Sequence, residues 1–138
     1  MNAITKLGIA VLALVGVLAG IPPAGADHLS SVKVINADQL KAWVDQGKTM
    51  VLIDSRIAAE YNAGHIPTAI NIPTAVMDRY REKLPRDRNS LLVFYCNGHP
   101  ECKKSHDASG KAVQWGYTNV QWFRDGIPAW QAKGYPVE

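Results

Sequence analysis

The chain has 138 residues, of which 47% are hydrophobic and 20% are charged, and its formal net charge is +3. This length supports one domain with a single core and leaves no room for a second. The small, scattered positive charge argues against nucleic acid or an anionic membrane as a partner.

The N-terminus has the pattern of a secretory signal peptide. Lys6 supplies a positive charge, residues 7–20 form an apolar run, two prolines follow, and Ala24-Gly25-Ala26 is a small-x-small cleavage site. The run is shorter than the roughly 18 to 20 residues that span a bilayer, which argues against the alternative of an uncleaved anchor. We therefore expect a signal peptide over 1–26, a domain over 27–138, a periplasmic or secreted location, and no membrane association after cleavage.

Hydrophobic spacing then predicts the elements in chain order. Leu40, Trp43 and Val44 indicate a helix over 38–46, and the apolar run that ends at Asp54 indicates a strand buried on both faces. The remaining pattern predicts helical turns over 58–62, a strand over 69–72, a polar helix over 74–83, a strand over 91–95, a helix that ends near 115, a strand over 120–123 and a helix over 127–133.

Apolar strands that alternate with helices predict an α/β domain with a mostly parallel sheet. In such sheets ligands bind beyond the carboxyl ends of the strands. Asp54 and Cys96 both fall at predicted carboxyl ends. We therefore expect a functional site at this edge.

Cys96 begins a short polar loop, Cys96-Asn97-Gly98-His99-Pro100-Glu101-Cys102, that runs into the next helix. The N–H groups of the loop and the helix N-terminus can point at the sulfur and favour a thiolate, the form that attacks sulfur or phosphorus. A buried structural cysteine is the alternative. Gly98 lets the backbone turn toward a bound anion, or is an ordinary turn glycine.

Other polar residues have a structural and a functional interpretation. Cys102 is either a resolving thiol that pairs reversibly with Cys96 or half of a permanent disulfide. Lys103 and Lys104 either face an anion or form a solvated surface. Arg56 is expected to form a structural pair with Asp54, with substrate contact as its second possible role. The four tryptophans are expected to pack in or near the core.

Several segments together resemble the single-domain rhodaneses, over nearly the whole predicted domain. They are Leu52-Ile53-Asp54-Ser55-Arg56, the stretch 60–73 (EYNAGHIPTAINIP), Val93-Phe94-Tyr95-Cys96, and 116–137 with its Gly-Ile-Pro-Ala-Trp motif. The resemblance implies a rhodanese-like fold with about five parallel strands and helices on both faces. It also implies sulfur transfer through a persulfide on Cys96, from a small sulfur anion or persulfide donor to a thiol, cyanide or protein acceptor, without a cofactor.

The residues expected to bind substrate are those of the loop and its flanks, namely Asn97, Gly98, His99, Glu101, Cys102, Lys103 and Arg56. Glu60 departs from the family pattern, because the better-known thiosulfate-using members have an arginine there. The catalytic loop is about one residue longer than usual. Glu101 adds negative charge beside the sulfur, which His99 and the two lysines can offset.

Three other functions compete with this one. Cys96, His99, Cys102 and His106 have the spacing C-x2-H-x2-C-x3-H, which suits zinc or copper, although four ligands in so short a segment are hard to arrange tetrahedrally. A cysteine phosphatase or arsenate reductase needs an arginine where Cys102 stands. A non-catalytic sulfur carrier or redox module that uses Cys96 and Cys102 would share the same cysteine chemistry.

Overall fold

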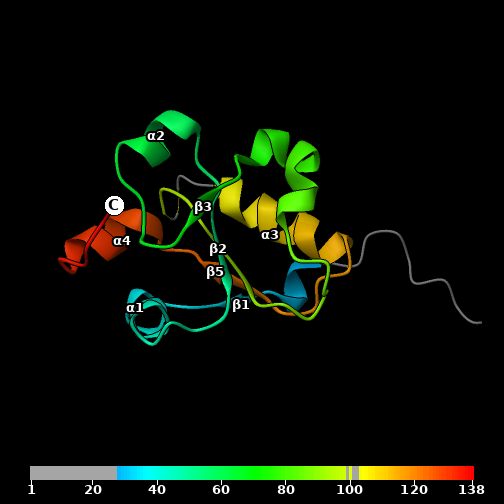
Figure 1. Cartoon of the computed structure of the whole chain (residues 1–138), viewed down its shortest axis with the longest axis horizontal. Coiled ribbons are helices and arrows are strands. Elements are labelled where there is room, and N and C mark those ends of the chain that lie inside the picture. Colours follow the sequence, from blue (N-terminus) through cyan, green and yellow to red (C-terminus); the bar gives the residue numbers. More distant parts are fainter. Residues whose placement is uncertain (1–27, 99, 101–102) are drawn as a thin grey trace, which may run out of the picture.

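Five parallel strands form one sheet, in the order β1-β5-β4-β2-β3 (Figure 1). The computed structural model describes residues 28–98, 100 and 103–138. The strands are β1 (Lys33–Val34), β2 (Val51–Asp54), β3 (Ile70–Asn71), β4 (Leu92–Tyr95) and β5 (Val120–Phe123). The helices are η1 (His28–Ser31), α1 (Ala37–Asp45), α2 (Ala58–Asn62), η2 (Thr74–Lys83), α3 (Lys104–Gln114) and α4 (Gly126–Ala132). The predicted α/β fold with a parallel sheet of five strands is confirmed.

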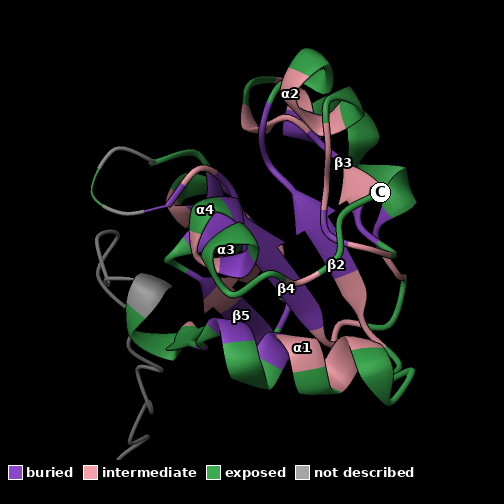
Figure 2. Ribbon diagram, turned by 90° about the vertical axis from the view of Figure 1, so that its left-hand side faces the viewer, coloured by how far each residue is buried: buried purple, intermediate pink, exposed green. Residues whose placement is uncertain are grey.

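Each face of the sheet has its own core, because successive side chains of a strand point to opposite faces. Leu52 and Val93 face α1 and α4 and pack with Leu40 and Trp130. The opposite face carries a second cluster, which packs against α3 and η2 and includes Ile53, Phe94, Ala108, Ala112 and Met77. Buried residues are concentrated in the central strands (Figure 2). The central strands β2 and β4 are thus buried on both faces, as their apolar sequences predict.

Local signals explain where several elements begin and end. The side chain of Asn36 caps α1 by accepting a hydrogen bond from the backbone N–H of Gln39 at 2.9 Å. The helix that follows the polar loop runs from Lys104 to Gln114, close to its predicted end. The strands over 51–54 and 120–123 also agree with the sequence pattern.

Three features differ from the predicted elements. β1 and η1 were not predicted from the hydrophobic pattern. β1 is only two residues long and both are exposed, so its place depends on pairing with β5. The polar segment 74–83 was expected to be a regular helix, but it is a 3-10 helix interrupted by non-helical backbone at Tyr80. Only Met77 in this segment is buried, so little packing favours a continuous helix.

The predicted signal peptide lies outside the described residues. Within 28–98, 100 and 103–138, no helix is both long enough and apolar enough to cross a membrane.

Candidate functional site

The carboxyl ends of β2 and β4 lie side by side and bring Asp54 and Cys96 to the same edge of the sheet. Asp54 pairs with Tyr95 in the parallel register. The backbone N–H of Ser55 donates to the carbonyl of Tyr95 at 2.9 Å, which continues the pairing past both strand ends. The predicted meeting of these two segments is confirmed.

Cys96 is almost fully buried, with 1% of its surface exposed. It is disulfide-bonded, and the only other cysteine of the chain, Cys102, lies outside the described residues. Its sulfur is 2.9 Å from the hydroxyl oxygen of Ser105, in the first turn of α3. The indole N–H of Trp122 on β5 donates to that same hydroxyl oxygen at 2.9 Å. Two polar side chains therefore form a path of hydrogen bonds that ends on the sulfur.

The start of the loop is held by the turn between β5 and α4. The carbonyl of Cys96 accepts a hydrogen bond from the backbone N–H of Ile127 at 3.0 Å. Gly98 and Gly126 face each other with φ values of +87° and +65°. A Cβ on Gly98 would lie 2.5 Å from the carbonyl oxygen of Asp125, and one on Gly126 would lie 2.5 Å from the nitrogen of Gly98. The close approach of these two backbones therefore requires glycine at both positions.

Glu60 on α2 connects the loop to α3. The amide group of Asn97 donates to Oε1 of Glu60 at 2.5 Å, and Nζ of Lys104 lies 3.5 Å from Oε2. The hydrogen bond from Asn97, together with the charge of Lys104, lowers the pKa of Glu60 although partial burial opposes this. An ionised carboxylate therefore lies next to the residue that follows Cys96.

Arg56 and Asp54 form the predicted structural pair. Nη2 of Arg56 is 2.6 Å from Oδ2 of Asp54, both side chains are buried, and Nη2 also donates to the carbonyl of Gly64 at 2.7 Å. Burial opposes ionisation, but the hydrogen bonds and charge of Asp54 outweigh it and raise the pKa of Arg56. The guanidinium thus ties the end of β2 to the segment after α2, and its contact with substrate stays a prediction.

The structure describes three of the other predicted site residues. Asn97 is half-buried and bound to Glu60, Gly98 is buried, and Lys103 is exposed at the start of α3. His99, Glu101 and Cys102 lie outside the described residues. The described part of the chain contains no group of three or more His, Cys, Asp or Glu side chains placed to hold a metal ion. Two of the four ligands in the metal hypothesis fall outside that part, so this hypothesis stays open.

Sequence reasoning missed two residues of the site, Ser105, whose hydroxyl contacts the sulfur, and Trp122, whose indole N–H binds that hydroxyl. Ser105 is nine residues beyond Cys96, and its place in the first turn of the helix was the only available signal. Trp122 was expected to be a packing residue, but its indole N–H has a specific polar partner. Nothing in the sequence pairs residues 105 and 122, because their contact depends on how α3 packs against β5.

Ser55 has a buried hydroxyl that no described residue binds. Its side chain is 1% exposed and directly follows Asp54, beside the start of the loop. An unsatisfied hydroxyl in such a position costs about 1 to 3 kcal/mol relative to a bonded one. The site therefore has a spare hydrogen-bonding group at its edge.

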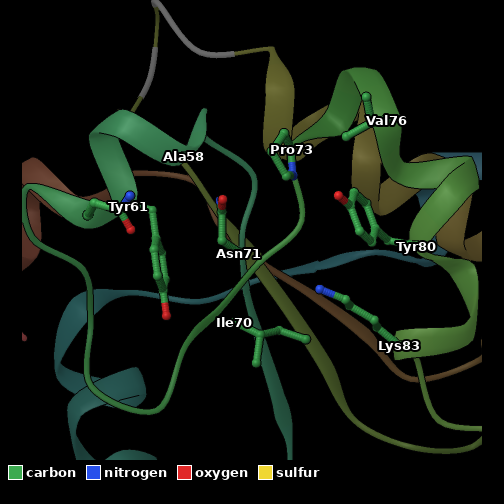
Figure 3. Close-up of a pocket in the computed structure, with 9 residues that line it drawn as sticks. Ala58, Tyr61, Ile70, Asn71, Pro73, Val76, Tyr80 and Lys83 are labelled. Carbon is green, nitrogen blue, oxygen red and sulfur yellow. The ribbon is translucent and has the colours of Figure 1, made fainter.

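A cavity of about 620 Å³ opens next to this edge, between α2, β3 and η2. Figure 3 shows Asn71 in its centre, with Tyr61 on one side and Tyr80 and Lys83 on the other. The amide of Asn71 donates to the carbonyls of Asp54 and Arg56, which fixes the segment after β2. The cavity is therefore adjacent to the Asp54 segment, but Cys96 does not line it.

Comparison with known proteins gives a consistent result. The model of the rhodanese-like domain matches residues 36–133. A sulfurtransferase of Allochromatium vinosum is 30% identical over 106 residues, which cover 77% of this chain and 94% of that protein. The crystal structure of a rhodanese-related protein from Thermoplasma volcanium has a TM-score of 0.63 at 29% identity, over 77% of this chain and 97% of that chain.

The matching domain also occurs in proteins with other names. The HTH-type transcriptional regulator Rv0324 of Mycobacterium tuberculosis is 35% identical over 123 residues, which cover 81% of this chain. That match covers 53% of the regulator, so this chain spans about half its length. Similarity of the domain alone therefore does not carry over the activity of a whole relative.

Proposed function

Because the chain belongs to the rhodanese-like domain family, we propose that it is a sulfurtransferase that moves a sulfane sulfur through a persulfide on Cys96. The observation that carries this proposal is the position of Cys96. It lies where the strand β4 gives way to the loop, with a hydroxyl oxygen 2.9 Å from its sulfur. A hydrogen-bond donor at this distance stabilises a sulfur anion.

The reaction has two half-reactions. In the first, the reduced Cys96 thiolate attacks the outer sulfur of the donor, a new S–S bond forms, and the donor's own S–S bond breaks; from thiosulfate, sulfite leaves. In the second, the acceptor attacks the outer sulfur, and the S–S bond to Cys96 breaks with its electron pair on Cys96. Cyanide as acceptor gives thiocyanate. The substituted-enzyme intermediate predicts ping-pong kinetics.

Glu60 supports a preference among donors. Its ionised carboxylate is bound to Asn97, next to Cys96, and a negative charge there repels a dianion. The thiosulfate-using rhodaneses that the chain resembles have an arginine at this position. The preferred donors are therefore persulfides and other sulfur compounds with less negative charge than thiosulfate.

The disulfide at Cys96 favours a redox role as the second candidate function. A disulfide-bonded cysteine cannot accept a sulfane sulfur until a thiol reductant opens the bond. Sulfur transfer therefore follows a reduction step, whereas a redox module would use the disulfide exchange itself. The two functions differ in whether an extra sulfur is ever carried.

The mass of the intact protein separates these functions. The full chain is reduced, treated with thiosulfate or a low-molecular-weight persulfide, and compared with Cys96→Ser and Cys102→Ser. One added sulfur in the wild type that is lost in Cys96→Ser and retained in Cys102→Ser supports the sulfurtransferase. A chain two hydrogens lighter that survives mild reductant and never gains sulfur contradicts it in favour of a structural disulfide. A bound metal in native spectra would favour the metal site.

The proposed setting is the periplasm or the extracellular space, from the sequence pattern of residues 1–26. Expression of the full chain in a bacterium with two membranes, followed by release of the periplasm, tests this. The expected product is a soluble chain that begins at Asp27. Recovery of the uncleaved chain with the membranes would contradict the setting and leave the chemistry of Cys96 intact.

A further inference from the structure

Ser105 and Trp122 form a directed path of hydrogen bonds to the sulfur of Cys96. The indole N–H of Trp122 is 2.9 Å from the hydroxyl oxygen of Ser105, and that oxygen is 2.9 Å from the sulfur. Ser105 has no exposed surface, so water cannot compete for its hydroxyl from outside. The two contacts together determine where the single hydroxyl proton points.

The direction follows from the donors and acceptors available. An indole N–H only donates, so Ser105 accepts from Trp122 and keeps its own proton for another acceptor. The disulfide-bonded Cys96 has no S–H, which makes the Ser105 hydroxyl the donor in the contact with sulfur. Because a hydroxyl that accepts a hydrogen bond becomes a better donor, Trp122 strengthens the bond to sulfur.

The position of Trp122 is set by its strand and by one ring contact. It lies on β5 in register with Phe94 of β4, on the face of the sheet that packs against α3. The ring of His106, one residue after Ser105, makes an edge contact with it, with centroids 5.2 Å apart. The contact with His106 and the hydrogen bond to Ser105 together orient the indole N–H toward the hydroxyl.

We propose that Trp122 is a positioning residue which, through Ser105, directs a hydroxyl proton at the sulfur of Cys96 and stabilises this sulfur as the leaving group when the persulfide is consumed. This role rests on the proposed function. When an acceptor takes the outer sulfur, the S–S bond breaks and its electron pair stays on the sulfur of Cys96. The hydroxyl of Ser105 donates to this developing thiolate, and no oxidant or reductant takes part.

The experiment uses the full chain with Cys102→Ser, which leaves Cys96 as the only cysteine. Ser105→Ala removes the hydroxyl, and Trp122→Phe removes the indole N–H but keeps an aromatic ring. The matched controls are Ser109→Ala and Trp115→Phe. Ser109 is a buried serine one turn further along α3 whose hydroxyl donates to the carbonyl of Ser105. Trp115 is a half-buried tryptophan with cation contacts to Arg81 and Lys111.

Two quantities are measured for each variant. The first is the pKa of the Cys96 thiol, from the pH dependence of its alkylation by iodoacetamide. The second is the single-turnover rate of transfer from the preloaded persulfide to cyanide. Ser105→Ala is expected to raise the thiol pKa by about one unit and to slow transfer about tenfold. Trp122→Phe is expected to cause about half of that pKa shift, and the two controls no shift.

The charged and titratable groups around the loop are left unchanged in all variants. Among the described residues they are Glu60 on α2, Lys103 before α3, Lys104 and His106 on α3, and Asp125 in the turn before α4. A change in thiol pKa therefore reports on the hydroxyl or the indole rather than on a lost charge.

Equal effects of Ser105→Ala and Ser109→Ala would overturn the proposal, since they would reflect general loosening of α3. A Trp122→Phe variant with the thiol pKa and rate of its parent would also overturn it. If Ser105→Ala does not fold, Trp122→Phe still decides, because it leaves Ser105 in place. Failure of the parent to form a persulfide contradicts the proposed function, whereas the alkylation profile still tests the hydrogen bonds to the sulfur.

Discussion

Substitution of Gly126 by alanine tests whether the turn before α4 holds the start of the loop that begins at Cys96. Gly126 has a φ of +65°, and a Cβ there would overlap the carbonyl oxygen of Cys96 and lie 2.5 Å from the nitrogen of Gly98. All of these neighbours are backbone atoms, which cannot move aside as a flexible side chain can. The loop and the turn must therefore separate in Gly126→Ala.

Gly134→Ala is the matched control. Gly134 has nearly the same backbone conformation, with a φ of +70°, but no atom lies within 4 Å of a Cβ placed there. Both variants lose about 1 to 2 kcal/mol because alanine disfavours a left-handed backbone. Only Gly126→Ala adds overpacking, about 1 to 3 kcal/mol. It also weakens the hydrogen bond from Ile127 to Cys96, at about 1 kcal/mol.

The expected free energy of unfolding is therefore about 2 to 4 kcal/mol lower in Gly126→Ala than in Gly134→Ala. Urea unfolding followed by tryptophan fluorescence measures this difference, with both proteins reduced so that the disulfide does not contribute. Gly126→Ala should also lose most of its capacity to take up sulfur, because Cys96 moves with its carbonyl. Two variants within 0.5 kcal/mol of each other would show that the loop does not depend on this close approach.

Further predictions concern single groups at the site. Without a thiol reductant the purified chain should transfer sulfur at a negligible rate, and Cys102→Ser should lose this dependence on reductant. Full activity of the oxidised wild type would contradict the need to reduce the disulfide before sulfur transfer. Glu60→Arg should raise kcat/KM for thiosulfate about tenfold, which corresponds to about 1.4 kcal/mol of transition-state stabilisation. Glu60→Gln should have an intermediate kcat/KM, because its amide oxygen still accepts a hydrogen bond from Asn97. Unchanged kcat/KM in both variants would refute the role of the charge. The hydrogen bond from Asn97 lowers the pKa of Glu60, so the ionised form of Glu60 stabilises the fold. The free energy of unfolding should therefore be higher in the wild type than in Glu60→Gln at pH values above the usual pKa of 4.5, and this difference should vanish as the pH falls through the lowered pKa. Urea unfolding at several pH values measures the difference. Ser55→Ala should raise the free energy of unfolding by about 1 kcal/mol, since it removes a buried hydroxyl that no described residue binds; a loss of stability would reveal a partner for that hydroxyl.

The sequence predicted the parts of the fold that depend on local pattern. Strands that are apolar throughout, such as β2 and β4, have to be buried on both faces, and this alone indicates a parallel sheet with helices on each side. The carboxyl ends of these strands then place Asp54 and Cys96 together. β1 could not be predicted, because two exposed residues carry no pattern and pair only once β5 is in place.

The site was predictable only where its residues are close in the chain. Asp54 and Arg56 are two residues apart at a strand end, and their ion pair follows from that spacing. The contacts of Glu60 with Asn97, and of Trp122 with Ser105, join residues 37 and 17 positions apart. Such contacts depend on how helices pack against the sheet, which hydrophobic periodicity does not specify.

The charges of the described residues around the loop fit the proposed attack of Cys96 on sulfur better than an attack on phosphorus. Phosphoryl transfer needs cations that hold the equatorial oxygens, and the guanidinium closest in sequence to this edge, that of Arg56, is occupied by Asp54 and Gly64. The carboxylate of Glu60, bound to Asn97, would repel a phosphate dianion. A persulfide needs less stabilisation of its charge than a phosphoryl group does, because that charge is single and spread over large sulfur atoms. A buried hydroxyl at 2.9 Å, fixed by an indole N–H, matches that smaller requirement.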